Sequence, residues 1–202
     1  MSHLRPEFRQ RAEELVALYP RPRSAMLPLC HLAQEQDGYL TSEAMEEIAE
    51  LIGTTPAEVR GTASFFDLFH LEPVGTYVVG ICTNIACLIA GGEQLLAHAE
   101  RTLGIAPGAT TSDRRFTLEE TECLADCDVA PCVQVNSRFV RTTTPEQFDA
   151  LVDELRANGR PEEIPPHGVL SRVRRKGGLA VPTDVVTAER AAFAEHADKA
   201  AH

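Results

Sequence analysis

The chain has 202 residues, of which 44% are hydrophobic and 5% aromatic, with no Trp and a formal net charge of −11 at pH 7. This length suffices for one large domain or two small ones, with a mostly aliphatic core. The negative charge gives no electrostatic support to nucleic-acid binding. No apolar run approaches the ~18 residues of a membrane-spanning helix, and the N-terminus lacks the apolar stretch of a secretory signal. We therefore expect a cytoplasmic protein without direct membrane insertion, whose thiols stay reduced.

The N-terminal part, residues 1–73, is predicted to be a helical domain. Apolar residues recur at helical spacing in four segments: 8–18, 24–36, 42–52 and 55–69. Side chains that can cap the starts of the last three segments are those of Ser24, Ser42 and Thr55, and Thr55 is predicted to form a capping box with Glu58. Gly38 and Gly53 are predicted to end the second and third helices, since glycine readily adopts the left-handed conformation found there.

The next part, residues 74–159, is predicted to be an α/β domain. Four β-rich runs are the predicted strands: 76–81, 117–121, 132–135 and 138–141. The first is apolar almost throughout, which is typical of a strand buried on both faces. Two helices are predicted, one over 93–103 and one that starts after Thr144 and ends at Gly159. This order of strands and helices is compatible with a thioredoxin-like sheet.

The last part, residues 160–202, has a different composition. It contains three prolines in its first seven residues and the basic stretch SRVRRKGG. We expect an extended or partly disordered tail. Its charges are either simply solvated or part of a strap laid across a partner subunit.

Two pairs of cysteines follow predicted strands. Cys82 and Cys87 lie between the first strand and the following helix, and Cys123 and Cys127 come directly after the second strand. Loops that leave neighbouring parallel strands meet at the same edge of a sheet, so the four thiols can converge on one site. Four thiolates bind either Zn²⁺ or an iron–sulfur cluster. The spacing alone does not decide between the two.

The remaining cysteines are Cys30 and Cys132. Cys127 and Cys132 also have four residues between them, so a rival ligand set would use Cys132 and omit Cys123. However, Cys132 follows Pro131 and begins the apolar run CVQV, so we expect it in the sheet, close to the site without being a ligand. Cys30 lies between leucines on a predicted helix and is expected in the core.

Two stretches, GTASFFDLFHLEPVGTYVVGICTNIACLIAGGEQLL and TLEETECLADCDVAPCVQVN, resemble the 24 kDa subunit family of NADH:quinone oxidoreductase, respiratory complex I. The resemblance extends over about residues 10–158. It implies an α/β fold in which an N-terminal helical bundle precedes a thioredoxin-like 2Fe–2S ferredoxin domain. It also implies that one 2Fe–2S cluster is held by four ligands: Cys82, Cys87, Cys123 and Cys127.

The same resemblance implies a function in electron transfer. Such a subunit belongs to the NADH-oxidising module, beside the FMN- and NADH-binding subunit and the large iron–sulfur subunit, in the peripheral arm on the cytoplasmic side of a bacterial membrane complex. The sequence contains no glycine-rich nucleotide fingerprint, so FMN and NADH are expected on the partner, and no catalytic residue is expected on this chain. Small subunits of NAD-dependent formate dehydrogenases and NAD-reducing hydrogenases share the domain and form the nearest alternative. A structural zinc module is a further one.

Overall fold

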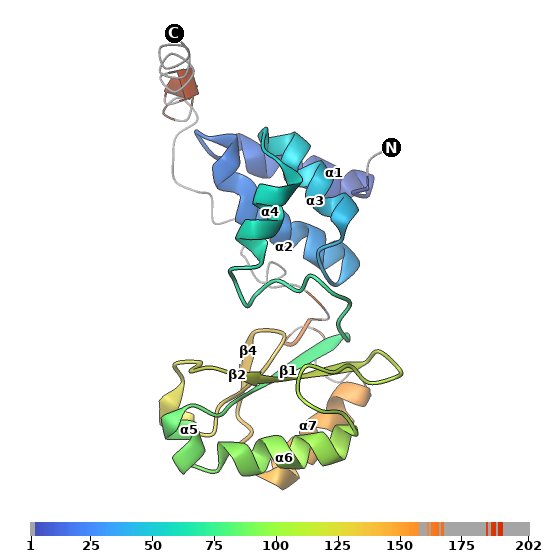
Figure 1. Cartoon of the computed structure of the whole chain (residues 1–202), viewed down its shortest axis with the longest axis vertical. Helices are drawn as coiled ribbons and strands as arrows, with labels where there is room; N and C mark the ends of the chain where they lie inside the picture. The colour runs from blue at the N-terminus through green and yellow to red at the C-terminus, as the bar shows by residue number, and fades with distance from the viewer. Residues whose placement is uncertain are drawn as a thin grey trace. The chain divides into compact units, whose positions relative to one another are not determined.

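The computed structural model describes residues 3–157 and, after them, 161, 163–165, 167, 185, 187–188 and 190–191. By internal contacts the chain divides into two units, Met1–Glu72 with Val169–His202, and Pro73–Gly168. We call the first the helical unit and the second the sheet unit (Figure 1). Among the described residues no helix is both long enough and apolar enough to cross a membrane.

The helical unit is a small bundle around an aliphatic core. Its elements are α1 (Pro6–Ala17), the 3-10 helix η1 (Pro22–Ala25), α2 (Met26–Asp37), α3 (Ser42–Ile52) and α4 (Pro56–Ala63). Gly38 and Gly53 adopt left-handed conformations and end α2 and α3, as predicted. Thr55 and Glu58 form the predicted capping box of α4.

Three predicted helix boundaries in this unit are wrong. Ser24 lies inside η1, because Pro22 starts a 3-10 turn ahead of α2, whose own start has no side-chain cap. Thr41, not Ser42, has the extended backbone of a cap and accepts a hydrogen bond from the third residue of α3. The helix α4 ends at Ala63 instead of near Phe69.

The sheet unit combines strands and helices. Its strands are β1 (Tyr77–Cys82), β2 (Phe116–Thr121), β3 (Val133–Val135) and β4 (Arg138–Val140). Its helices are α5 (Ile85–Ile89), α6 (Gly92–Leu103), the 3-10 helix η2 (Cys127–Val129) and α7 (Pro145–Arg156). The strand order is β2-β1-β3-β4. The strands β1 and β2 are parallel, whereas the other pairs are antiparallel. The helices α6 and α7 cover one face of the sheet (Figure 1).

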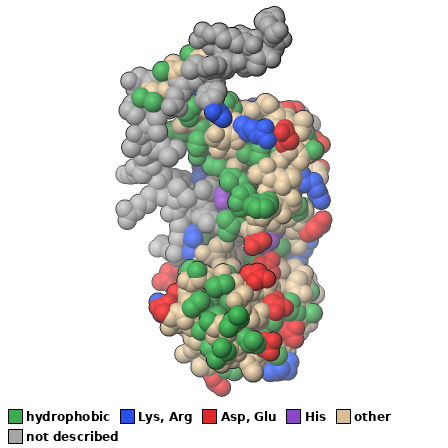
Figure 2. All heavy atoms as spheres, turned by 60° about the vertical axis from the view of Figure 1, so that its left-hand side comes forward, with side chains coloured by type: hydrophobic (Ala, Val, Ile, Leu, Met, Phe, Trp, Pro, Cys, Tyr) green, Lys and Arg blue, Asp and Glu red, His purple; other side chains and the backbone are tan. Residues whose placement is uncertain are grey.

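The four strands were predicted within one residue at each end, and the short helix α5 was not predicted. Five residues are too few to show a helical repeat in the sequence. The only local signal is Asn84, whose side chain accepts a hydrogen bond from the N–H of Ile85 and caps the helix. On the side of the sheet unit that carries α5, hydrophobic side chains gather at the surface (Figure 2). The predicted end of α7 at Gly159 lies outside the described residues.

Most of the predicted tail, 160–202, also lies outside the described residues. Val185, Thr187, Ala188, Arg190 and Ala191 are described and helical. The guanidinium group of Arg190 donates hydrogen bonds to the carbonyl oxygens of Val16 and Tyr19, at 2.7 Å each. These carbonyls lie at the C-terminal end of α1 and just after it, where backbone acceptors lack partners within the helix.

The turn between β3 and β4 is tied to the rest of the sheet unit by one side chain. Asn136 and Ser137 both have positive φ, 47° and 59°, as a tight hairpin turn requires. The Asn136 side chain accepts a hydrogen bond from Val78 N–H at 2.8 Å. Its amide nitrogen donates to the carbonyl oxygens of Thr76 and Pro165, at 2.9 Å each. This buried amide therefore joins β1, the turn and the segment after α7.

Replacing Asn136 by Ala should lower the free energy of unfolding by about 2–4 kcal/mol, because buried backbone groups lose their partners. Ser137→Gly is the matched control, since glycine adopts the same left-handed conformation without strain and stability should hold or rise slightly. Urea denaturation followed by circular dichroism measures both variants. Equal stability of Asn136→Ala and the wild-type protein would contradict this role.

Candidate metal centre

The two cysteine loops leave the same edge of the sheet. Cys82 is the last residue of β1 and lies opposite Thr121, the last residue of β2, in the parallel ladder. Cys123 follows two residues after Thr121. The parallel pairing thus brings the start of each loop to one place, as the sequence predicted.

The first loop is folded tightly around its two thiols. Cys87 lies on the inner side of α5, and it and Cys82 are each 1% exposed. Gly92 begins α6 directly behind them. A Cβ atom at Gly92 would lie 2.6 Å from the Cys82 carbonyl oxygen and 2.9 Å from that of Cys87, so only glycine fits. The turn from α5 to α6 is therefore packed against the backbone that carries both thiols.

Backbone N–H groups from this loop and from other segments point at these two sulfur atoms. Burial raises the pKa of the Cys82 thiol, while hydrogen bonds from the N–H groups of Asn84 and Leu124 lower it. Leu124 belongs to the second cysteine loop, so this contact joins the two loops. The N–H of Cys132 donates to the Cys87 sulfur at 3.4 Å. Such donors stabilise negative charge on sulfur.

The second loop holds an exposed pair of thiols. The sulfur atoms of Cys123 and Cys127 lie 3.9 Å apart, and both residues are exposed. The hydrogen-bonded Cys123 thiol raises the pKa of Cys127, and the two thiols of the first loop act in the same direction through their charge. The four candidate thiols therefore form one buried and one exposed pair, and Cys127 of the exposed pair is close enough to the buried pair to be influenced by its charge. In the described part of the chain, no three Cys, His, Asp or Glu side chains are grouped to hold a single metal ion.

Cys132 borders the site from the sheet. Its carbonyl oxygen accepts a hydrogen bond from Cys82 N–H at 3.0 Å, so its backbone pairs with β1. Its thiol lies 2.9 Å from the carbonyl oxygen of Asp126. Burial, and then the neighbouring Cys87 thiol, raises the pKa of Cys132 to about 12. Cys30 lies elsewhere, in the core of the helical unit, where burial raises its pKa to about 12.

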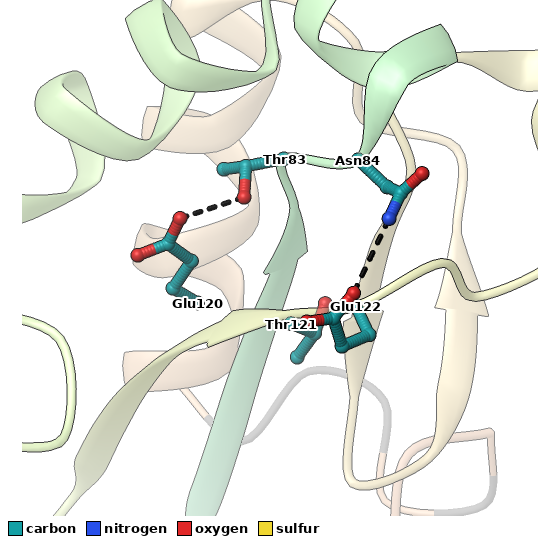
Figure 3. A pocket seen from close by; sticks show the side chains of 5 residues that line it. All are labelled: Thr83, Asn84, Glu120, Thr121 and Glu122. Atoms are coloured by element: carbon teal, nitrogen blue, oxygen red, sulfur yellow. Dashed lines mark hydrogen bonds between the residues drawn. The ribbon is translucent and has the colours of Figure 1, made fainter.

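Polar side chains next to the cysteines join the ends of β1 and β2. They line a hollow of about 440 Å³: Thr83, Asn84, Glu120, Thr121 and Glu122 (Figure 3). The Thr83 hydroxyl donates to the Glu120 carboxylate at 2.7 Å, and the Asn84 amide donates to the Glu122 carboxylate at 3.2 Å. Thr83 and Asn84 were not predicted to be site residues. An Asn directly before an apolar segment is the one signal that could have indicated Asn84.

Comparison with known proteins identifies the family. Residues 12–156 match the family model of the thioredoxin-like [2Fe-2S] ferredoxins. The chain belongs to this family. Membership confirms the resemblance, the predicted thioredoxin-like fold and the predicted 2Fe–2S cluster.

Relatives from three bacterial genera share this domain, and each is named as a subunit of NADH-quinone oxidoreductase. The chain is 44% identical over 147 residues to the one from Mycobacterium tuberculosis, a match that covers 73% of this chain and 58% of the relative. It is 42% identical to the one from Thermus thermophilus, over 75% of this chain and 86% of the relative. It is 40% identical to the one from Rhizobium meliloti, over 78% of this chain and 94% of the relative.

A solved structure is similar as well. The NAD+-reducing [NiFe]-hydrogenase in its air-oxidised state contains a chain that aligns with a TM-score of 0.57 and 27% sequence identity. The alignment covers 64% of this chain and 23% of the hydrogenase chain.

The chemistry of the site fits a thioredoxin-like [2Fe-2S] ferredoxin. Thiolates are the usual ligands of a 2Fe–2S cluster, and this site gathers four thiols from two loops. Three backbone N–H groups directed at sulfur atoms, those of Asn84, Leu124 and Cys132, are the kind of contact that adjusts the reduction potential of such a cluster.

Neutralising Asp126 or Asp128 as Asn should raise the reduction potential by roughly tens of millivolts, because a nearby carboxylate disfavours the extra negative charge of the reduced cluster. Asp126 and Asp128 flank Cys127. Asp153→Asn on α7 removes the same charge outside the two loops and should change the potential less. Redox titration followed by EPR measures all three. An unchanged or lower potential in both loop variants would contradict the expectation.

Proposed function

We propose that this chain is the electron-transfer subunit that carries one 2Fe–2S cluster in the NADH-oxidising module of an NADH:quinone oxidoreductase. The observation that carries the proposal is the convergence of two cysteine pairs at the shared edge of β1 and β2. It occurs in a chain whose relatives bear the name of subunits of that oxidoreductase. The chain spans 58% of the mycobacterial relative that it matches.

The proposed cluster ligands are Cys82, Cys87, Cys123 and Cys127. A bound 2Fe–2S cluster supplies one-electron exchange, and the chain's own residues hold it and adjust its surroundings. The buried pair and the tight turn at Gly92 exclude water from one side of the site. The N–H groups of Leu124 and Cys132 donate to sulfur, which offsets part of the negative charge that the thiolates bring.

The proposed partners are the FMN- and NADH-binding subunit and the large iron–sulfur subunit of the same complex. NADH oxidation would take place on the flavin-bearing partner, and this chain would exchange single electrons with it. In this proposal the chain has no catalytic residue of its own and is one subunit of a proton-translocating NADH dehydrogenase. It would lie in the peripheral arm, on the cytoplasmic side of the membrane.

A second candidate is the equivalent part of an NAD-reducing hydrogenase. The structural similarity to such an enzyme favours it. The site and its chemistry would be the same, and only the accompanying subunits would differ.

Purification of the native complex distinguishes the two candidates. We expect this chain to copurify with the flavin-bearing and large iron–sulfur subunits and with NADH:quinone reductase activity. Hydrogen-dependent NAD reduction, together with nickel in the complex, would instead establish the second candidate. A chain that contains zinc and no iron or acid-labile sulfide would contradict both.

The ligand assignment predicts opposite results at neighbouring cysteines. Replacing any of the four proposed ligands by Ser should remove most of the visible absorbance and the EPR signal of the reduced protein, because a hydroxyl replaces a soft thiolate poorly. Cys132→Ala and Cys132→Met should keep the full cluster content, with at most a small shift in potential. Iron and sulfide analysis measures this, with Cys30→Ser as the control for loss of a buried thiol.

Loss of the cluster in Cys132→Ala, together with its retention in Cys123→Ser, would show that Cys132 is the ligand instead. A wild-type spectrum in all four Ser variants would refute the site as a whole.

A further inference from the structure

The helix α5 exposes its apolar side chains next to the metal centre. Ile85 is 72% exposed, Leu88 42% and Ile89 82%. They form a patch on the outer side of a helix whose inner side carries the buried Cys87. Large aliphatic side chains gain free energy when they leave water, so a contiguous exposed group of them marks an interaction site. We call these three residues the α5 patch.

The α5 patch is presented by a firmly held turn. The Asn84 side chain caps α5 through Ile85 N–H at 2.9 Å and is itself bonded to Glu122 at the end of β2. Leu88 N–H donates to the Asn84 carbonyl oxygen at 2.8 Å. At the other end of α5, Gly92 is packed against the cysteine backbone. A partner therefore meets an apolar surface that is already ordered, which lowers the entropic cost of binding.

The surroundings of the α5 patch are acidic. Segments 82–94 and 119–130, which form the two cysteine loops and their flanks, contain no Lys, Arg or His. They contain six carboxylates: Glu93, Glu119, Glu120, Glu122, Asp126 and Asp128. Figure 2 shows acidic side chains along the border of the hydrophobic area on this side of the sheet unit. An apolar centre within a charged border is the usual anatomy of a protein–protein interface.

We propose that the α5 patch docks a different protein, one that presents an apolar socket bordered by Lys and Arg. Charge decides between the possible occupants. A second copy of this chain would set one acidic border against another, and an anionic membrane surface would be repelled in the same way. A partner surface bordered by Lys and Arg is instead attracted to the acidic surroundings of the patch.

The inference rests on the proposed function, in which the occupant is the flavin-bearing subunit. Since Cys87 lies on the inner side of α5, docking there puts the partner against the cysteine site.

The test uses the full-length chain with its cluster and the separately purified flavin- and NADH-binding subunit. Ile89→Glu places a charge on the most exposed residue of the patch and should weaken binding by about 30-fold or more. The matched control is Phe139→Glu on β4, an exposed apolar residue of the same unit, 54% exposed, which should change affinity less than about threefold. Affinity is measured at low and high salt, and iron content and the EPR spectrum are recorded for each variant.

Wild-type binding should weaken as salt is raised, because the acidic border attracts a basic one. Both Glu variants should keep the wild-type iron content and EPR spectrum, which shows that any loss of binding is not loss of the site. If the wild-type chain binds and Ile89→Glu binds equally well, or if Phe139→Glu weakens binding as much, the docking proposal is overturned while the proposed function stands.

If the wild-type chain holds its cluster but does not bind the flavin subunit, the proposed function fails and the docking proposal fails with it. A wild-type dimer that Ile89→Glu dissociates would assign the patch to a second copy and overturn the proposal. Binding to phosphatidylglycerol vesicles that the same substitution abolishes would overturn it in favour of a membrane.

Discussion

The parallel pairing of β1 with β2 is the constraint on which the metal centre depends. It sets Cys82 opposite Thr121 at the ends of the two strands, so both cysteine loops begin at one edge. An antiparallel pairing would send the loops to opposite edges and separate the two thiol pairs. The hydrogen bonds from the side chains of Thr83 and Asn84 to glutamates at the end of β2 reinforce the alignment of the two strand ends. The geometry of the site therefore follows from the central strand pair and not from the loops alone.

The strands β3 and β4 lie on the other side of β1 from β2. The strand β3 pairs with β1 in the antiparallel direction, which brings its preceding residue, Cys132, to the same edge. There the N–H of Cys132 donates to the Cys87 sulfur, and its carbonyl oxygen accepts a hydrogen bond from Cys82 N–H. Asn136, at the far end of β3, fixes the turn to β1 and to Pro165. The short strand β3 thus links the metal centre to the segment after α7.

Much of this could be predicted from the sequence, because strong local signals and tertiary packing agree. The apolar run of β1, the glycines after α2 and α3 and the capping box of α4 each allowed a single interpretation. The errors arose where signals were short or ambiguous. Thr41 and Ser42 are both able to cap, and backbone geometry decides between them. The helix α5 is shorter than two turns. The N–H bonds to sulfur from Leu124 and Cys132 depend on how distant segments meet, which spacing does not encode.

The two thiol pairs differ in their exposure to solvent, so the two sides of the site are not equivalent. Cys82 and Cys87 are sealed beneath α5 and the turn to α6, whereas Cys123 and Cys127 face solvent. Reagents that arrive from solution, such as an iron donor, a chelator or peroxide, reach the Cys123–Cys127 side first. Loading and damage of the centre therefore share one entrance.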